Sequence, residues 1–225
     1  ISNPHNPVGR SWKHEELLRL GEIALKNNLV VIADEIHSDL VLPGAKHVPF
    51  IGVDERFKEI AVTFYAPSKT FNLAGMSTSA VVIPGEKLRK SYELTLQKFH
   101  AWLGNMMGLE TYLSAYTDGD EWLNELISVL DENRTIILEF VSKYKDVLSI
   151  SGPEATYMAW IDFSKLGFTD DELKDWLINK VGLGLNHGLG FGTGGDGYQR
   201  LNFACPKVIL EHALSLLSAE LDKLK

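Results

Sequence analysis

Apolar residues follow two different spacings in the first part of the chain. Between residues 14 and 27 they recur every three or four positions after Ser11, which predicts an amphipathic helix with Ser11 as its N-cap. The segments 29–33, 60–65 and 79–83 are instead continuous apolar runs rich in branched side chains. Such runs are typical of parallel strands that are buried on both faces. A helix followed by buried strands predicts an α/β layer with a largely parallel sheet.

The second part of the chain carries a long helical pattern followed by shorter elements. Apolar side chains repeat at three and four positions from residue 119 to 145, which predicts a long amphipathic helix connecting two domains. Short strands are then expected at 156–163 and 200–204, and helices at about 170–181 and 207–224. This mixture of short strands and helices predicts a small α+β domain.

Composition limits the class of protein and of partner. The 225 residues, 45% of them hydrophobic, suffice for one large domain or two small ones with a packed core. A formal net charge of -8 argues against nucleic acid or an anionic membrane as the main partner, because both favour a basic surface; small molecules or other proteins fit better. No apolar run approaches the roughly 20 residues of a membrane span. The single cysteine, Cys205, cannot form an internal disulfide, which fits a reducing, cytoplasmic setting.

A glycine-rich segment covers residues 188 to 197 and contains the pattern G-x-G-x-x-G twice, beginning at Gly190 and at Gly192. In a dinucleotide site this fingerprint lies between a strand and a helix. Here the segment is followed by a predicted strand at 200–204. The sequence therefore favours a flexible loop over a dinucleotide site.

Four candidate metal ligands occur at the end of the first predicted strand, in the segment "DEIHSD": Asp34, Glu35, His37 and Asp39. No other part of the sequence supplies partner ligands at a recognisable spacing. The alternative is an acidic residue at a strand end with an imidazole nearby. Neither interpretation alone fixes a function.

Lys69 lies in the segment "APSKTFNLAG", directly after a predicted buried strand and a proline. Its neighbours are small or apolar, so the amine would lose solvation, which favours its neutral form. A neutral amine can act as a nucleophile or form a Schiff base. The alternative, from this segment alone, is a surface lysine on a turn.

The order of these features resembles a known family. An Asn-Pro loop, an acidic residue at the end of the next strand and a Ser-Lys pair after the strand beyond it resemble the fold-type I pyridoxal-phosphate (PLP) enzymes, the aspartate aminotransferase superfamily. The resemblance is closer to the class I/II branch of carbon-sulfur β-lyases, often called cystathionine β-lyases. Five ordered motifs, spread from Asn3 to the C-terminal helix, carry it: "NPHNPVGR", "DEIHSDL", "SKTFNLAG", "TYMAWIDF" and "RLNFACP".

The resemblance implies a PLP site with five residues of this chain. Lys69 would bind the cofactor as a Schiff base and move the substrate α-proton as general base and acid. Asp34 would pair with the pyridine nitrogen and keep it protonated. Asn6 would donate a hydrogen bond to the phenolate oxygen of the ring, His37 would lie near the same oxygen, and Ser68 would bind the phosphate.

The resemblance also implies a substrate site, with two departures from the family pattern. Arg200 would bind the substrate α-carboxylate in bidentate fashion, and the alternative for Arg200 is a surface ion pair. The superfamily often has an arginine eight residues after the lysine and a serine three residues before it. This chain has Ser77 and Ala66 there. Phosphate binding would therefore depend on Ser68 and on an upstream loop.

Two reactions are compatible with these residues. The branch resemblance favours β-elimination, which converts cystathionine or a cysteine-like amino acid to pyruvate, ammonia and a thiol, and His37 agrees with it weakly. The alternative is an aminotransferase that passes the amino group to a 2-keto acid. A second alternative, from another class, is an inactive fragment or regulatory module of the same fold.

The resemblance finally predicts how the chain is organised. It implies the C-terminal part of a PLP-binding large domain at 1–118, an interdomain helix at 119–145 and a small α+β domain at 146–225. The family's glycine-containing phosphate loop and ring-stacking aromatic residue would lie upstream, so the chain alone is expected to bind cofactor poorly. A homodimer is also implied. The segment 101–110, with Trp102, Leu103, Met106 and Met107, is a candidate interface helix or ordinary core packing.

Overall fold

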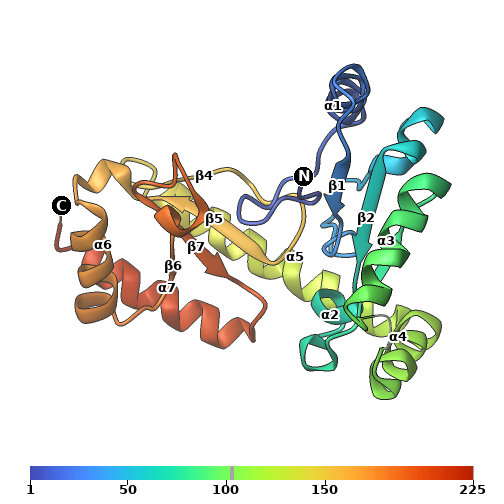
Figure 1. The fold of residues 1–225 in the computed structure, drawn as a ribbon. Coiled ribbons are helices and arrows are strands. Elements are labelled where there is room, and N and C mark those ends of the chain that lie inside the picture. Colours follow the sequence, from blue (N-terminus) through green and yellow to red (C-terminus); the bar gives the residue numbers. More distant parts are fainter. Residues whose placement is uncertain (102–103, 225) are drawn as a thin grey trace. The chain divides into compact units, whose positions relative to one another are not determined.

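The computed structural model describes residues 1–225 except Trp102, Leu103 and Lys225. The chain divides into two compact units. The first contains Ile1–His5 and Ser11–Leu126, and the second contains Asn6–Arg10 and Ile127–Lys225. Figure 1 labels their helices and strands.

Three strands form the sheet of the first unit, in the order β1 (Val31–Asp34), β2 (Ala61–Tyr65) and β3 (Ala80–Val82). β1 and β2 run parallel with Asp34 opposite Phe64, whereas β3 is antiparallel to β2. Residues 1–3 continue the sheet beside β1, because the N–H of Asn3 donates to the carbonyl of Asp34 and the N–H of Asp34 to the carbonyl of Ile1, both at 2.9 Å. The predicted parallel pairing is confirmed for β1 and β2.

The helices of the first unit are α1 (His14–Lys26), α2 (Pro67–Thr70), α3 (Glu86–Lys98) and α4 (Met106–Asp118). The predicted helix at 14–27 is confirmed, but Ser11 is not its N-cap. The helix begins after Lys13, whose N–H donates to the Glu16 carboxylate at 2.9 Å. This bond satisfies one of the amide groups that a helix N-terminus leaves without a partner, so no side chain of residue 11 is needed there.

The core of the first unit lies between α1, β1 and the 3₁₀ turns that precede β2. Leu17 of α1, Phe50 and Phe57 are fully buried, and the two phenylalanine rings stack with centroids 5.1 Å apart. The expectation that the first strand is buried on both faces is wrong. Val31 and Ala33 are buried, but Ile32 between them, whose side chain points to the opposite face of the sheet, is 59% exposed.

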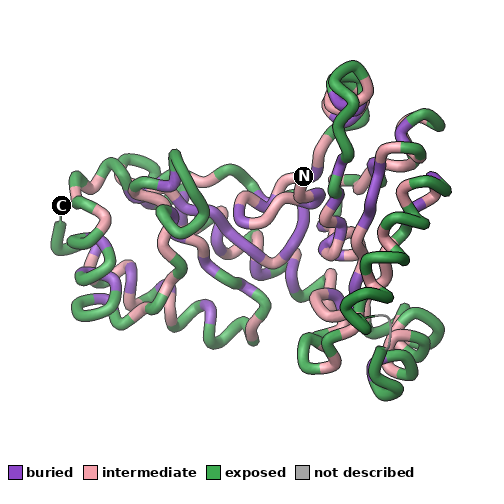
Figure 2. Tube along the Cα trace, viewed as in Figure 1, coloured by how far each residue is buried: buried purple, intermediate pink, exposed green. Residues whose placement is uncertain are grey.

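The long helix α5 (Asp120–Lys143) contains the boundary between the two units. Its buried residues are Leu130, Asn133, Ile137 and Val141, which recur every three or four positions. This spacing places them on one side of the helix, as the sequence pattern predicts. In α7 (Lys207–Leu221) the buried residues are Leu210, Leu214, Leu217 and Leu221. Figure 2 marks the buried residues along the chain.

The second unit contains an antiparallel sheet in the order β4 (Ser149–Ile150), β5 (Met158–Asp162), β7 (Tyr198–Asn202) and β6 (Asn186–His187). Helix α6 (Asp170–Trp176) begins with a capping box between Thr169 and Glu172 and continues into a π-helical turn, Leu177–Val181. The predicted strands and helices of this region are all present: β5, α6 and α7 are shorter than predicted, and β7 begins two residues earlier than the predicted strand at 200–204. Among the described residues, no helix is long and apolar enough to cross a membrane.

Candidate functional site

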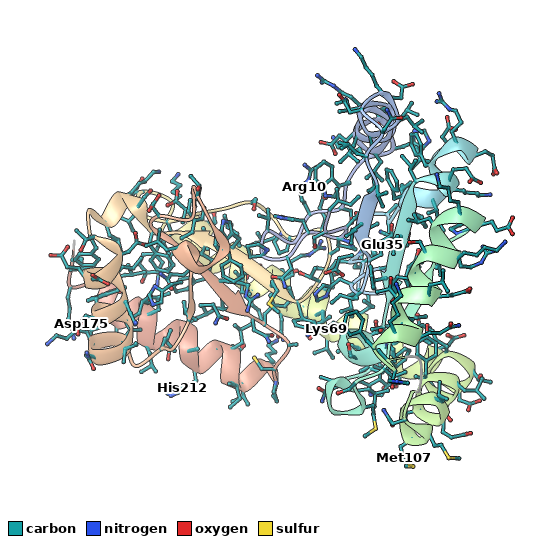
Figure 3. The ribbon with its side chains drawn as sticks, in the orientation of Figure 1. Arg10, Glu35, Lys69, Met107, Asp175 and His212 are labelled. Carbon is teal, nitrogen blue, oxygen red and sulfur yellow. The ribbon has the colours of Figure 1, made fainter. Side chains whose placement is uncertain are left out.

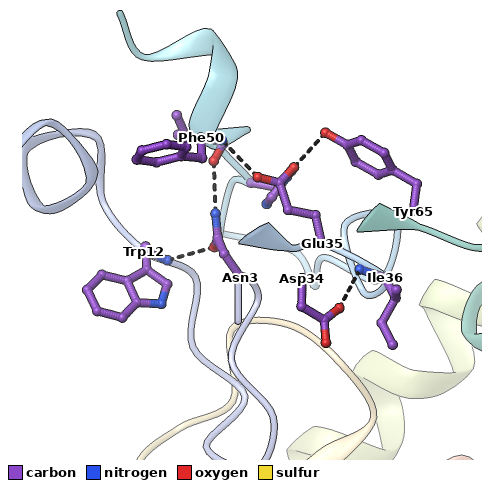
Figure 4. Close-up of polar contacts among 9 residues, drawn as sticks. Asn3, Trp12, Asp34, Glu35, Ile36, Phe50 and Tyr65 are labelled. Atoms are coloured by element: carbon purple, nitrogen blue, oxygen red, sulfur yellow. Dashed lines mark hydrogen bonds and ion pairs between the residues drawn. The ribbon is translucent and has the colours of Figure 1, made fainter. Parts of the chain in front are cut away.

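Asp34 lies at the C-terminal end of β1. Because β2 runs parallel to β1, the C-terminal ends of both strands lie at the same edge of the sheet. Its carboxylate accepts a hydrogen bond of 3.2 Å from the N–H of Ile36 through Oδ1 (Figure 4). Its backbone N–H and carbonyl are hydrogen-bonded to the backbone of Ile1 and Asn3. Asp34 is therefore fixed in position while its second carboxylate oxygen stays available to a ligand.

Lys69 follows the neighbouring strand on the short helix α2 (Figure 3). The chain leaves β2 through Ala66 in extended conformation, and Pro67 occupies the first helical position, where a missing N–H costs nothing. Ser68 and Lys69 are half-buried on this helix. Because β1 and β2 are parallel neighbours, this lysine belongs to the same edge of the sheet as Asp34.

A buried threonine anchors the helix that carries Lys69. The hydroxyl of Thr70 donates to Oδ2 of Asp39 at 2.8 Å, and the hydroxyl of Tyr116 on α4 donates to the same oxygen at 2.8 Å. Burial, together with the negative charge of Asp39, raises the pKa of Tyr116 above its ordinary value of 10. The tyrosine therefore stays protonated and remains a hydrogen-bond donor to Asp39.

Glu35 forms a buried polar cluster next to Asp34. Its fully buried carboxylate accepts hydrogen bonds from the Tyr65 hydroxyl at 2.7 Å and from the Phe50 N–H at 2.8 Å (Figure 4). It also lies 3.2 Å from Nε2 of His47. Burial, followed by the hydrogen bond to Glu35, raises the pKa of Tyr65 above its ordinary value. Sequence reasoning missed this cluster, whose only signal was a second acidic residue directly after a predicted strand.

The three acidic side chains and the histidine of the "DEIHSD" segment do not converge. Glu35 and Asp39 are each bound to their own hydrogen-bond donors, as described above, and His37 is buried with 3% of its surface exposed. Over the described ranges, no group of three or more histidine, cysteine, aspartate or glutamate side chains is arranged to hold a metal ion. The segment thus separates into Asp34 at the sheet edge and two structural carboxylates.

Asn6 and Arg200 come together in the second unit, although 194 positions separate them in sequence. The guanidinium of Arg200, on β7, donates through Nη1 to Oδ1 of Asn6 at 2.8 Å and through Nη2 to Oδ1 of Asn186 at 2.9 Å. Desolvation lowers the pKa of Arg200 from its ordinary value. Its positive charge faces neutral amides and no carboxylate among the described residues, which argues against a surface ion pair.

The loop that carries Asn6 is held by its own unit. The carbonyl of Gly9 accepts hydrogen bonds from the N–H groups of Glu154 and Ala155 at 2.7 and 2.8 Å. Gly9 has φ +76°, and a Cβ there would lie 2.9 Å from Cβ of Pro153. Only glycine fits this turn, which explains the glycine that follows the second Asn-Pro pair.

The two positions that depart from the family pattern, Ala66 and Ser77, lie at the ends of short helical turns. Ala66 is buried at the start of α2, and Ser77 ends a 3₁₀ turn with φ +48°. Neither position gives evidence of a ligand role.

The fold and the order of the site residues define a class, and the sequence matches the aminotransferase class I and II family over residues 1–217. The chain belongs to this family, as its motifs predict. It therefore has the fold-type I architecture of PLP-dependent transferases, seen here in part.

Two of the curated relatives that the chain matches are cystathionine β-lyases. The chain is 40% identical over 222 residues to cystathionine β-lyase PatB of Bacillus subtilis, covering 99% of this chain and 57% of that protein. It is 32% identical to the cystathionine β-lyase of Corynebacterium glutamicum, covering 97% of this chain and 58% of that protein. The chain thus spans somewhat more than half of the length of these relatives.

Solved structures that contain PLP have the same fold. A PLP-bound putative aminotransferase from Clostridium difficile has a TM-score of 0.93 at 40% identity, covering 96% of this chain and 56% of that one. Cystalysin from Treponema denticola, which contains PLP, has a TM-score of 0.95 at 34% identity, covering 100% and 57%.

Proposed function

We propose that the whole protein is a PLP-dependent carbon-sulfur β-lyase that releases pyruvate, ammonia and a thiol from cystathionine or a cysteine-like amino acid. The observation that carries this proposal is the pair of Lys69 and Asp34 at one edge of the β1–β2 sheet. The 40% identity to a cystathionine β-lyase supports the choice of reaction.

The residues of this chain fit PLP. Lys69 is a half-buried residue, and Asp34 has a carboxylate oxygen without a hydrogen bond among the described residues. Lys69 would hold the cofactor covalently, Asp34 would pair with its ring nitrogen, and Ser68 would bind its phosphate. Asn6 would donate to its phenolate oxygen, with His37 near the same oxygen. When bound, PLP withdraws electrons from the substrate α-carbon and so makes the α-proton acidic.

The side chains of this chain then perform the proton transfer and the orientation. Arg200 binds the substrate carboxylate, which fixes the α-carbon, and Nζ of Lys69 removes the α-proton. The electron pair left behind expels the thiolate from the β-carbon, and the thiolate leaves as the thiol after gaining a proton. Water completes the conversion of the remaining three-carbon unit to pyruvate and ammonia, without an oxidant or reductant.

We also propose a homodimer in the cytoplasm, with PLP-binding residues in the segment 1–118 and a small domain at 146–225. Helix α4 supports the dimer because its apolar side chains Met106, Met107, Leu109 and Leu113 are between 58% and 80% exposed. Trp102 and Leu103 of the candidate interface helix lie outside the described residues. The net charge and the single cysteine favour a small amino-acid substrate and a reducing compartment.

The test uses the full-length protein with PLP and L-cystathionine and no keto acid, and measures pyruvate. We expect sustained pyruvate and ammonia release from the wild type and none from Lys69→Ala. A new amino acid that forms only when a 2-keto acid is added would establish the aminotransferase instead. The absence of both products would favour the inactive or regulatory alternative.

A further inference from the structure

The glycine-rich segment 188–197 is a closed arch, not an open loop. It begins with the 3₁₀ turn Gly188–Phe191 and returns to the sheet at β7. Its two sides touch, because a Cβ on Gly188 would lie 1.9 Å from the carbonyl oxygen of Gly195 and a Cβ on Gly195 would lie 2.1 Å from the carbonyl oxygen of Gly188. These two glycines are required for contact between backbones and not for flexibility.

The arch places one aromatic ring on Arg200. Cζ of Arg200 lies 4.7 Å from the centroid of the Phe191 ring, within the range of a cation–π contact. A second ring supports Phe191, since Trp160 forms a T-shaped pair with it at 86° with centroids 5.4 Å apart. Trp160 is itself stacked on Tyr198 at 5.3 Å. Phe191 is therefore held in place from behind.

The guanidinium is oriented from three directions. Asn6 and Asn186 each accept from a different terminal nitrogen, and Phe191 lies over the group. Each terminal nitrogen carries a second hydrogen, so the guanidinium can still bind both oxygens of a carboxylate. The three neighbours add no negative charge, and desolvation strengthens the attraction of the cation for an anion.

We propose that Phe191, presented by the arch 188–197, is a positioning residue that orients Arg200 for the substrate α-carboxylate; this inference rests on the proposed function. Phe191 acts on substrate binding through Arg200 and has no part in breaking the carbon-sulfur bond. Its loss therefore raises KM and leaves kcat nearly unchanged.

The test compares Phe191 variants of the full-length, PLP-loaded protein with L-cystathionine. A cation–π contact of this kind corresponds to a change of roughly fivefold to tenfold in binding. Phe191→Leu is expected to raise KM by that factor, with kcat within twofold of the wild-type value. Phe191→Tyr keeps an aromatic face, so its KM and kcat should both stay within twofold of the wild-type values. Leu189→Ala is the matched control, because Leu189 is an exposed apolar residue of the same 3₁₀ turn.

A double-mutant cycle with Arg200→Lys shows whether Phe191 acts through the guanidinium. In that background Phe191→Leu is expected to change KM by less than twofold, because lysine lacks the planar group that the ring orients. An unchanged KM in the single variant, an equal rise in Leu189→Ala, or a full rise that persists in the Arg200→Lys background would overturn the proposal.

A second readout separates this inference from the reaction itself. The dissociation constant of L-alanine, followed through the absorbance of the bound cofactor, requires a carboxylate but no carbon-sulfur bond. We expect it to rise by the same factor in Phe191→Leu. A wild type that makes no pyruvate would refute the lyase, and the L-alanine measurement would still decide the role of Phe191: an unchanged constant would refute it.

Discussion

The hydroxyl of Tyr65 donates a 2.7 Å hydrogen bond to the carboxylate of Glu35, and this bond joins the ends of the parallel strands β1 and β2. Glu35 directly follows Asp34, and Tyr65 precedes Lys69 by four residues. The two residues thus connect the backbone beside one proposed cofactor ligand to the backbone beside the other. We expect this cluster of Glu35 and its hydrogen-bond donors to fix the positions of Asp34 and Lys69 relative to each other.

Glu35→Gln is expected to destabilise the fold by about 2–4 kcal/mol, because it leaves buried donors poorly matched. One carboxylate oxygen serves Phe50 and the other serves Tyr65 and lies near His47, so an amide can replace only one acceptor. Urea unfolding measures the effect. Glu93→Gln on the exposed surface of α3 is the control and should change stability by less than about 0.5 kcal/mol. Equal stability of the two variants would contradict this role.

Tyr65→Phe should lower the free energy of unfolding at neutral pH, and the difference from the wild type should become smaller at alkaline pH. The folded pKa of Tyr65 lies above its ordinary value of 10, so the folded state holds the proton more tightly than the unfolded state. The stabilisation is complete below the unfolded pKa and is lost as the pH rises above it toward the folded pKa. The gap in urea midpoint between the wild type and Tyr65→Phe is thus expected to be constant from pH 7 to 9 and to narrow at pH 11. A gap that widens there would refute the assignment.

The lowered pKa of Asp54 gives a contribution to stability that is lost at acidic pH, the opposite of the dependence expected for Tyr65. Its carboxylate accepts hydrogen bonds from the guanidinium of Arg56 and then from the backbone N–H of the same residue, which lowers its pKa from 3.8 to about 2. A lowered folded pKa stabilises the fold above the unfolded pKa, and this contribution is lost as the pH falls through the folded pKa. Asp54→Asn should therefore unfold at lower urea than the wild type at pH 7. The difference should shrink between pH 4 and 2, and a constant difference would show that charge is not its cause.

Asp34→Asn tests the proposed partner of the cofactor nitrogen. An asparagine Oδ1 can still accept from the N–H of Ile36, so we expect the melting temperature to change little. An amide cannot stabilise a protonated ring nitrogen by charge, so kcat should fall by about a hundredfold or more. Asp146→Asn, at an exposed position, serves as the control for the loss of one negative charge. Near-normal turnover in Asp34→Asn would reject the role.

Two glycines of the arch should respond differently to the same change. Gly188→Ala would place Cβ 1.9 Å from the carbonyl oxygen of Gly195, which backbone cannot accommodate without moving. We expect a loss of about 2 kcal/mol or more in unfolding free energy. Gly190→Ala meets nothing within 4 Å and should cost less than about 1 kcal/mol. Similar values for both variants would mean that the arch is not closed.

Local patterns predicted most of the elements, whereas contacts between distant residues were out of reach. The helix at 14–27 and the strand around Ala61 follow from spacing and branching within one segment. The exposure of Ile32 depends on what covers the sheet, which its own segment does not encode. The hydrogen bond between Glu35 and Tyr65 joins residues 30 positions apart, and no pattern in either segment predicts it.

The candidate site shows the same difference between what local sequence predicts and what it does not. The motifs singled out Lys69, Asp34, Asn6 and Arg200 because their order resembles a family. The arch was expected to be a flexible loop because glycine has two uses, conformational freedom and close approach, that sequence alone does not distinguish. Its contact between Gly188 and Gly195 identifies the second use.

The chain passes between its two units three times, after His5, Arg10 and Leu126. The five residues Asn6–Arg10 therefore belong with a unit whose remaining sequence starts more than a hundred positions later. A chimera of two family members joined only at Leu126 would pair Asn6 and Gly9 of one parent with Arg200 and Pro153 of the other. Exchange of the second unit between relatives, in evolution or in the laboratory, thus preserves its internal contacts only when this short loop is exchanged with it.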